Sequence, residues 1–460
     1  MVPHVEPDLV VVSNRGPLSF ARDASGELTM RRAAGGLVSA LGPGVAGRGA
    51  TWIAAAITDD DREAAARGLV GAEGFAVQLL DIDAASYGMY YDVVANSTLW
   101  FLHHHMFDSP RRPRIDRRWR EAWGAYRRVN ERFATLVADT APQGATVLVQ
   151  DYHLPLLGDR LRTSRPDLAT VHFNHTPFCE PDVLRMLPDG VGEELLVGLA
   201  GHRACGFHSP RWADAFIACC EERLGATPTT FVAPAAPDLD DVRNVVGSPA
   251  SESAHADLEA LVGTRKLIVR VDRIELSKNL LRGFWAYDDL LETYPEWRQQ
   301  VVFAAFVYPS RQSLPEYLSY RSEVESVIER VNAKWGTPTW TPIHFDPTDN
   351  FPASVAGLRR YDALLVNPVR DGLNLVAKEG PAVNERDGVL LLSRESGAWD
   401  ELAPWALEVN PFDVAGTADA LHRALSMPDD ERGRLAAGLR QAATCHTPDD
   451  WLQQQLAAAR

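Results

Sequence analysis

Short apolar runs that end in polar residues recur along the first half of the chain. They cover residues 8–13, 51–56, 147–150 and 170–173, and a weaker run covers residues 229–232. Runs of four to eight apolar, often β-branched residues bounded by turns are typical of strands buried on both faces. Such strands belong to parallel sheets covered by helices, so the pattern predicts an α/β domain here.

The same pattern restarts in the second half. Further runs cover residues 266–272, 301–307, 363–366 and 388–393, and an amphipathic helix is expected over residues 279–294. Between the two sets, the polar residues 238–256 contain proline and serine and are interpreted as a linker. The chain is therefore predicted to form two Rossmann-like doubly wound domains, residues 1–240 and 241–446, with a last helix over residues 447–460 that could pack back on the first.

The composition excludes several classes of protein. The 460 residues are 46% hydrophobic and 23% charged, and no apolar run reaches the roughly 18 to 20 residues of a membrane-spanning helix. A net charge of −16 argues against binding to nucleic acid. The first residues lack the basic and apolar regions of a signal peptide, and the five cysteines form no C-x-x-C pair. We therefore expect a cytoplasmic protein with reduced thiols.

Two charged clusters each allow two interpretations. Eight arginines crowd residues 111–128, which suggests either a solvated helical face or a loop that faces the phosphate of a ligand. Three consecutive aspartates at residues 59–61 could be taken for the metal site of a sugar transferase. We favour the first turn of a helix that is capped by Thr58 or Asp59 and ends at Gly68, because acidic residues there complement the helix dipole.

One stretch of the second half combines a strand end, a turn and a helix start. The apolar residues 363–366 lead through Asp371-Gly372 into a segment that is expected to be helical from about Asn374. Free backbone N–H groups and the positive end of the dipole at a helix N-terminus suit a phosphate, and Glu379 would lie on the same helix. An ordinary strand-turn-helix connection is the alternative.

Cationic residues follow the neighbouring predicted strands. Arg273 and Lys278 come just after one strand, and Arg311 follows another. Because ligands of parallel α/β sheets bind outside the carboxyl ends of the strands, these side chains should gather at one edge with Asp371-Gly372. Two cations opposite a helix N-terminus could hold a diphosphate and stabilise it as a leaving group, although each charge alone is more often a surface charge.

The predicted strands of the first half also end in polar residues. Arg15 follows the first strand, and two later strands end in titratable residues that include Asp151 and His175. Two such endings in one half make a binding cleft plausible. The paired glycines Gly35 and Gly36 open a predicted helix, where they allow either the close approach of a ligand or a simple turn.

Short motifs occur in the order seen in one family of sugar transferases. They are S-N-R at 13–15, G-G-L at 35–37, Y-Y at 90–91 with N-x-x-L-W at 96–100, D-Y-H-L at 151–154, P-F at 177–178, S-K at 277–278, P-S-R at 309–311 and R-D-G-L-N-L-V-A-K-E at 370–379. On these motifs the sequence from Val11 to about Pro411 resembles the trehalose-6-phosphate synthases, retaining glycosyltransferases of family 20. The resemblance implies the GT-B architecture, in which two Rossmann-like domains face each other across a cleft. It also implies transfer of glucose from GDP- or UDP-glucose to glucose 6-phosphate, giving trehalose 6-phosphate.

The resemblance implies roles for the residues at matching positions. Those that would bind the acceptor, glucose 6-phosphate, are Arg15, Tyr91, Trp100, Asp151 and Arg311. Those that would bind the donor are Gly35, Gly36, His175, Arg273, Lys278, Asp371, Gly372, Leu373, Asn374, Leu375, Val376 and Glu379. Those with an implied catalytic role are Arg273, Lys278, Asp151, His175 and Asp371. Within the donor set, Arg273 and Lys278 would contact the diphosphate and Glu379 the ribose.

The mechanism and partners are implied in the same way. In the family the acceptor attacks from the face that the diphosphate leaves, and the diphosphate itself receives the proton. We favour an orienting role for Asp151, with general-base catalysis as the alternative. We find no closely spaced carboxylate pair of the hydrolase type, so positioning and charge neutralisation would supply the catalysis. We expect small-molecule substrates, no cofactor, no metal, no nucleic acid and no membrane, and a homo-oligomer stays open.

The sequence departs from the family at several positions, so the nucleobase of the donor is not fixed. Two alternative functions also stay open. Residues 273–279 read R-I-E-L-S-K-N instead of R-L-D-Y-S-K-G, and Gln150 replaces a histidine. We favour GDP-glucose, because Asn279 and the small residues Ala304-Ala305 could make room for a purine. The alternatives are a related transferase acting on a nucleotide-linked cyclitol and a catalytically silent sugar-phosphate sensor. The retained motif at residues 371–379 and the cationic pair favour the synthase.

Overall fold

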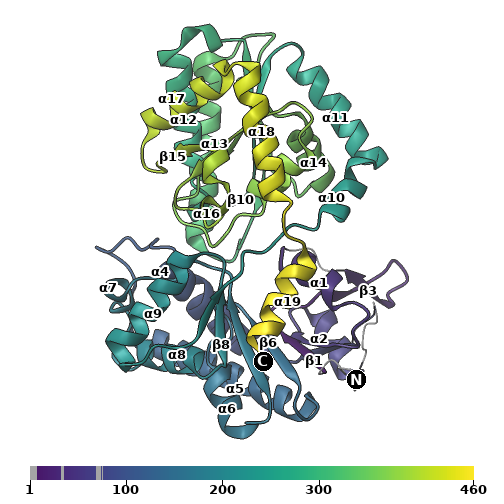
Figure 1. Ribbon diagram of the computed structural model, residues 1–460, viewed down its shortest axis with the longest axis vertical. Coiled ribbons are helices and arrows are strands. Elements are labelled where there is room, and N and C mark those ends of the chain that lie inside the picture. The colour runs from purple at the N-terminus through teal and green to yellow at the C-terminus, as the bar shows by residue number, and fades with distance from the viewer. Residues whose placement is uncertain (1–7, 33–35, 69–73, 75) are drawn as a thin grey trace. The chain divides into compact units, whose positions relative to one another are not determined.

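The chain folds into two compact α/β units. The computed structural model describes residues 8–32, 36–68, 74 and 76–460 (Figure 1). Unit 1 comprises Met1–Ala235 and Pro448–Arg460, and unit 2 comprises Ala236–Thr447. Within the described residues, no helix is long and apolar enough to cross a membrane. All five cysteines are described, and no disulfide joins them.

Unit 1 is built on a parallel sheet. Within its described residues the strand order is β5-β4-β1-β6-β7-β8-β9, and every neighbouring pair is parallel. The strands are β1 (Leu9–Val12), β4 (Thr51–Ala55), β5 (Ala76–Leu80), β6 (Thr146–Gln150), β7 (Ala169–Asn174), β8 (Ala204–Phe207) and β9 (Thr230–Val232). The predicted runs correspond to β1, β4, β6, β7 and β9. The sequences of β5 and β8, A-V-Q-L-L and A-C-G-F, give no such signal because a polar residue or a glycine interrupts them.

Helices and a separate β-hairpin complete unit 1. The hairpin strands are β2 (Leu18–Arg22) and β3 (Leu28–Arg32), which pair antiparallel. The helices are α1 (Gly36–Val45), α2 (Asp59–Ala66), α3 (Ala84–Gly88), α4 (Trp100–His103), α5 (Arg117–Thr140), α6 (Leu157–Ser164), α7 (Pro181–Leu184), α8 (Val191–Ala200), α9 (Pro210–Leu224) and α19 (Pro448–Ala458). A π-helix, η1 (Met89–Leu99), joins α3 to α4. This π-helix was not predicted, because no residue pattern distinguishes it from an α-helix.

Unit 2 contains a second parallel sheet, of order β12-β11-β10-β13-β14-β15. Its strands are β10 (Lys266–Ile274), β11 (Val301–Pro309), β12 (Ile343–Asp346), β13 (Ala363–Val366), β14 (Val389–Ser393) and β15 (Leu407–Val409). Its helices are α10 (Leu239–Val246), α11 (Pro249–Val262), α12 (Leu280–Thr293), α13 (Pro315–Trp335), α14 (Phe351–Arg360), α15 (Val376–Val383), α16 (Trp399–Leu402), α17 (Val414–Ser426) and α18 (Asp429–Ala443). Short 3-10 helices are η2 (Leu276–Lys278), η3 (Pro295–Trp297) and η4 (Ala403–Trp405).

Both sheets reverse their strand order next to their first strand. Numbered within its sheet, each begins with the order 3-2-1-4-5-6, which is that of the Rossmann fold. The reversal separates β1 from β6 in unit 1 and β10 from β13 in unit 2. Loops after such a pair of strands diverge to opposite faces and leave a crevice at the carboxyl edge, where ligands bind. The fold therefore predicts ligand binding at the carboxyl ends of these four strands.

The predicted linker at residues 238–256 is wrong, because this segment forms helices α10 and α11. The Asp238 carboxylate accepts hydrogen bonds from the amides of Asp240 and Asp241, at 3.2 and 3.1 Å. Ser248 accepts one from Ser251 N at 3.2 Å and precedes a proline in the first turn of α11. The polar residues that suggested a linker are thus helix caps.

The C-terminal helix α19 packs into unit 1. It is the yellow helix labelled among the purple and teal elements of that unit in Figure 1. Trp451 is fully buried, and its indole N–H donates to Ala233 O at 3.1 Å. Arg203 donates to Ala459 O at 2.6 Å. Unit 1 therefore includes a core side chain from the far end of the sequence.

The two charged clusters have structural explanations. Asp61 Oδ1 accepts from Phe20 N at 2.7 Å, and the Thr58 hydroxyl accepts from Asp61 N at 3.0 Å, so the aspartates open the capped helix α2 as favoured. Among the arginines, the Arg111 side chain is 84% exposed and pairs with Asp108 at 3.0 Å. This arginine lies on a solvated face.

Candidate active site

The turn between β13 and α15 lies at the carboxyl edge of the unit 2 sheet. Asn374 has a φ of 80°, in the left-handed region, which does not continue into a right-handed helix. The helix therefore begins at Val376, two residues later than predicted. The amides at this helix start have no carbonyl of a preceding helical turn to bond, although Lys378 N donates to Leu375 O at 2.8 Å. The predicted phosphate-binding amides of Leu375 and Val376 stand at this helix start.

Lys278 is fixed beside this turn by two carboxylates. Its Nζ lies 2.6 Å from Asp371 Oδ2 and 3.9 Å from Asp272 Oδ1. Asn374 Nδ2 donates to the same Asp371 oxygen at 3.1 Å. Burial lowers the pKa of Lys278, but the attraction of Asp371 and Asp272 outweighs it and the pKa is raised. The structure thus brings together three predicted donor-site residues around a charged ammonium group.

The segment after β14 braces the same turn. Gly397 N donates to Asp371 O at 3.1 Å, and the Ser396 hydroxyl donates to Leu373 O at 2.6 Å. A Cβ atom on Gly397 would lie 1.9 Å from Gly372 O, which no side chain allows. The predicted site residues Gly372 and Leu373 are therefore held from behind by a contact that requires glycine.

Arg273 and Arg311 meet at a buried glutamate that was not predicted. Glu275 Oε1 lies 3.0 Å from Arg273 Nη1 and 3.3 Å from Arg311 Nη1, and accepts from the Ser310 hydroxyl at 3.0 Å. Burial alone would raise the pKa of Glu275, but Arg273, Arg311 and Lys278 lower it to about 2. Two predicted cations are thus gathered by one carboxylate at the ends of β10 and β11.

The side chain of Glu379, on α15, makes no polar contact with another described residue. Among the described residues, no hydrogen bond or ion pair to this partly exposed side chain is found. Burial, together with the charge of Asp241, raises the pKa of Glu379 to about 7. A carboxylate with unmet hydrogen-bonding capacity at this position suits donors such as sugar hydroxyls.

The strand ends of unit 1 carry the predicted polar residues. Arg15 follows β1 and is exposed, while Asp151 follows β6 with a φ of 71°. Its Oδ1 accepts from His175 N at 3.3 Å. Since β1 and β6 flank the reversal of the sheet, both side chains lie at its crevice. Gly36 opens α1, and Gly35 lies outside the described residues.

An aromatic row leads from the π-helix towards Asp151. The ring of Tyr91 stacks on Tyr87 at 5.3 Å and on His153 at 5.6 Å between centroids. Tyr91 remains partly exposed, as a ligand contact requires. Trp100 is only 3% exposed and stacks on His104 at 4.2 Å. The acceptor roles of both residues stay predictions, and only Tyr91 has an accessible ring to support its role.

His175 belongs to a hydrogen-bond relay that occupies both of its ring nitrogens. Gln150 Nε2 donates to Gln455 Oε1 at 3.1 Å, so Gln150 Oε1 accepts from His175 Nε2 at 2.9 Å. His208 Nε2 donates to His175 Nδ1 at 3.3 Å. Burial lowers the pKa of His175 well below its usual value, and His208 lowers it further. The ring is neutral and held in place, so proton transfer is not part of its predicted catalytic role in this geometry.

The residues that suggested room for a purine are buried in unit 2. Ala304 and Ala305 are fully buried within β11, paired with Val269 and Arg270 of β10. Asn279 is also buried, and its amide donates to Asn367 O and Pro411 O at 3.0 and 2.7 Å. The preference for GDP-glucose therefore stays a prediction. The sequence cannot separate a small residue in a sheet core from one in a pocket.

Glu275, Gly397 and Gln455 are site residues that the sequence analysis missed. The spacing R-x-E just past a predicted strand, and a Ser-Gly pair after another, were available signals for the first two. Gln455 gave none, because it meets Gln150 across 305 residues of sequence.

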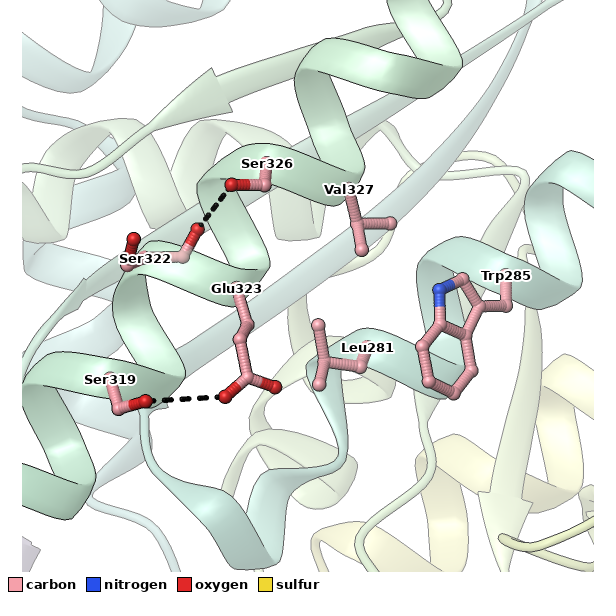
Figure 2. Close-up of a pocket in the computed structure, with 7 residues that line it drawn as sticks. All are labelled: Leu281, Trp285, Ser319, Ser322, Glu323, Ser326 and Val327. Carbon is pink, nitrogen blue, oxygen red and sulfur yellow. Dashed lines mark hydrogen bonds between the residues drawn. The ribbon is translucent and has the colours of Figure 1, made fainter.

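A hollow of about 330 Å³ lies on unit 2 (Figure 2). Helices α12 and α13 line it with Leu281, Trp285, Ser319, Ser322, Glu323, Ser326 and Val327. The Ser319 and Ser326 hydroxyls donate to Glu323 and to Ser322 O, at 3.3 and 2.8 Å. It brings together none of the predicted site residues, so we place the candidate site at the strand ends.

Comparisons with known proteins match nearly the whole chain. A model of glycosyltransferase family 20 matches residues 7–460. A trehalose-6-phosphate synthase of Mycolicibacterium vanbaalenii is 31% identical over 98% of this chain and 95% of that protein. A UDP-forming alpha,alpha-trehalose-phosphate synthase of Dictyostelium discoideum is 30% identical over 96% of this chain, which spans 61% of that protein. A UDP-forming synthase of Burkholderia xenovorans, solved in complex with glucose-6-phosphate, gives a TM-score of 0.85 and 26% identity over 98% of this chain and 99% of that one. The predicted GT-B fold class of two Rossmann-like domains is confirmed.

Proposed function

This chain belongs to glycosyltransferase family 20, and on that basis we propose that it forms trehalose 6-phosphate by transferring glucose, with retention, from a nucleoside-diphosphate glucose to glucose 6-phosphate. Membership of the family makes it a retaining glycosyltransferase. The names of the relatives supply the reaction that we propose.

One observation carries the proposal. At the reversal of the unit 2 sheet, Lys278 Nζ lies 2.6 Å from Asp371 Oδ2, beside the N-terminus of α15. Arg273 lies at the end of β10, the strand that precedes Lys278. A fixed ammonium group, a guanidinium and free helix amides at one strand edge favour a diphosphate. Glu379, eight residues after Asp371, offers a carboxylate to the ribose hydroxyls of the same nucleotide.

The chemistry requires charge stabilisation more than proton transfer by side chains. As the bond between glucose C1 and the diphosphate breaks, negative charge grows on the diphosphate, and Lys278 and Arg273 neutralise it. The acceptor hydroxyl forms the new bond to C1 on the same face and gives its proton to a leaving phosphate oxygen. Neutral His175 and Asp151 would orient the sugars, because a properly placed pair of substrates needs little else.

UDP-glucose is the donor to test first. The D. discoideum and B. xenovorans synthases are named as UDP-forming. Asn279, Ala304 and Ala305, on which the preference for GDP-glucose rests, are buried. The nucleobase is therefore assigned by assay and not by any side chain.

The test is a donor comparison with the purified chain. Glucose 6-phosphate is incubated separately with UDP-, GDP- and ADP-glucose, and nucleoside diphosphate release and the disaccharide phosphate are measured. We expect release and product with at least one donor, with the α,α linkage identified by NMR. No release with any donor would refute the function, and substrate binding without release would point to a silent sugar-phosphate sensor.

Replacing Lys278 tests the leaving-group role. Lys278→Ala should lower kcat by about 10²-fold or more, which is typical for loss of a charge that stabilises a transition state. Lys334→Ala is the matched control, because Lys334 pairs with Asp288 and Glu292 on the surface. An unchanged rate for Lys278→Ala would remove the assignment.

We propose further that the reaction needs no metal or cofactor. Lys278 and Arg273 supply the positive charge that a divalent cation supplies to phosphates elsewhere. Turnover should therefore survive dialysis against EDTA. The cytoplasm is the compartment we propose, because charged sugar phosphates and nucleotide sugars do not cross membranes unaided.

A further inference from the structure

The carboxylate of Glu275 gathers three donors on a single oxygen. Arg273, Arg311 and Ser310 all approach Oε1, at 3.0, 3.3 and 3.0 Å. Glu275 is 1% exposed, so it sits behind the two guanidinium groups and does not face solvent. A buried carboxylate that accepts from two arginines fixes both side chains.

The backbone explains why these residues meet. Strands β10 and β11 are adjacent and parallel, with Arg273 opposite Tyr308 and Ile274 opposite Pro309. The residues that follow the two strands therefore start side by side. Glu275 N donates to Arg273 O at 2.8 Å in a tight turn, and Arg311 has a φ of 43°. Both segments turn at the strand ends, and Glu275 stands at the point where they meet.

Glu275 is ionised and is paired with two arginine side chains. Its ionised state follows from the neighbouring cations, which keep it charged at any pH at which the protein would work. The Arg273 side chain nevertheless remains 45% exposed. Glu275 therefore holds this guanidinium without removing it from solvent, where an incoming phosphate can reach it.

We propose that Glu275 is a positioning residue that sets Arg273 towards the donor diphosphate and Arg311 towards the acceptor phosphate, so that one carboxylate aligns the binding of both substrates. This inference rests on the proposed function, in which the two arginines serve different substrates. Glu275 touches neither substrate and acts only through the arginines.

Removing the negative charge of Glu275 has two opposing effects on phosphate binding, so the direction of the change in affinity tests the inference. Glu275→Gln keeps the shape and deletes a negative charge close to two phosphate sites. If Glu275 only lowered the positive potential there, phosphate would bind more tightly in the variant. If Glu275 aligns the arginines, both substrates bind more weakly, by about tenfold or more for lost charge-assisted hydrogen bonds.

The kinetic experiment measures kcat and both KM values for wild type, Glu275→Gln, Glu275→Asp and Glu329→Gln. We expect KM for both substrates to rise about tenfold or more in Glu275→Gln, with a smaller change in kcat. Glu275→Asp should restore much of the loss, since it keeps the charge that the family places here as aspartate. Glu329→Gln makes the same substitution at an exposed position of α13 and serves as the matched control, with little effect expected. A change confined to one substrate, or to kcat, would overturn the inference.

A double-mutant cycle separates alignment from general damage. In an Arg273→Ala background, Glu275→Gln should no longer weaken donor binding but should still weaken acceptor binding, because only Arg311 is left to align. This double variant keeps the net charge of the wild-type cluster, because one cation and one anion are removed together, so it tests the inference if Glu275→Gln alone does not fold. Equal effects in both backgrounds would contradict alignment.

Binding of simple anions keeps this inference distinct from the proposed function. Inorganic pyrophosphate and phosphate are titrated calorimetrically into the full chain. If wild type turns over no donor yet binds pyrophosphate more tightly than Glu275→Gln, the function fails and the alignment stands. Equal or tighter binding by Glu275→Gln, or no binding by either protein, overturns the alignment.

Discussion

The charged side chains at the strand ends of unit 2 differ in the charges that surround them, and therefore in the direction in which their pKa is shifted. Lys278 and Glu275 each find opposite charges nearby and stay ionised. Glu379 finds none and lies near Asp241, so burial raises its pKa to about 7. An uncompensated carboxylate in an otherwise balanced site is a cost to folding that a bound ligand can offset.

Replacing Glu379 should stabilise the protein at high pH and weaken donor binding. In the unfolded chain its pKa is near 4.5, so between about pH 4.5 and 7 the folded protein holds a proton that the unfolded chain has lost. Stability therefore falls as pH rises through this window. Glu379→Gln removes that penalty, which at about 1.4 kcal/mol per tenfold change in proton affinity amounts to at most about 3 kcal/mol at pH 8. Thermal unfolding at pH 5 and pH 8 measures it.

The control for this prediction is Glu329→Gln. This substitution makes the same chemical change at an exposed position of α13. The gain in melting temperature of Glu379→Gln over this control should grow between pH 5 and pH 8. A gain that is equal at both pH values would show that burial of charge is not its cause. Calorimetric titration with the nucleoside diphosphate should give weaker binding to Glu379→Gln alone.

Residue identity alone indicated which charged side chains gather at the strand ends of unit 2, but not their partners. Lys278 and Asp371 stand out as charged residues after strands, and the sheet brings them within 2.6 Å. The sequence does not reveal that the ring nitrogens of His175 are both occupied, because Gln150 and His208 approach it from other strands and loops. Hydrogen-bond partners depend on tertiary packing, which motifs do not encode.

At the scale of elements, strands were the most predictable feature of this chain. Parallel strands are buried on both faces, and so they appear as continuous apolar runs. Helices α10 and α11 were misread because Asp238 and Ser248, which look like linker residues, cap them. The start of α15 was placed two residues early, since a left-handed Asn374 ahead of a helix is set by the turn it completes.

The turn that holds the donor site should depend on a glycine behind it. Gly397→Ala would place a Cβ 1.9 Å from Gly372 O, so the turn at residues 371–373 must shift. We expect donor KM to rise at least about tenfold and the unfolding free energy to fall by about 1–3 kcal/mol, as for other overpacked sites. Kinetics and chemical denaturation measure the two effects.

A second glycine provides the matched control for this element. Gly247 follows α10 with a φ of −80°, and a Cβ there would meet nothing within 4 Å. Gly247→Ala should therefore leave donor KM unchanged. If Gly397→Ala also leaves donor KM unchanged, the contact behind the turn does not position the donor site.

At the scale of the whole molecule, the two units differ in how they are assembled from the sequence. Unit 2 is one continuous segment, Ala236–Thr447, and contains a complete sheet with its own reversal point. Unit 1 is discontinuous, because α19 supplies the buried Trp451 and the Gln455 that holds Gln150. The C-terminal residues therefore serve the fold of the N-terminal half.

This difference predicts unequal behaviour of the separate units. Residues 236–447 expressed alone should fold, because they form one continuous compact unit with its own core, and should bind a nucleoside diphosphate without turning over glucose 6-phosphate. Residues 1–235 alone should be unstable, since losing a fully buried tryptophan side chain costs about 3–5 kcal/mol. Joining residues 448–460 to residue 235 by a flexible glycine-serine linker should restore a cooperative thermal transition.

A Trp451→Ala version of the joined fragment is the control, and it should resemble residues 1–235 alone. Circular dichroism melting and calorimetric titration with UDP and GDP measure folding and binding for each fragment. If residues 1–235 unfold as cooperatively without α19 as with it, the helix is an appendage and not part of the core. If residues 236–447 fold but bind neither nucleotide, the diphosphate site needs more of the chain than the strand ends of unit 2 provide.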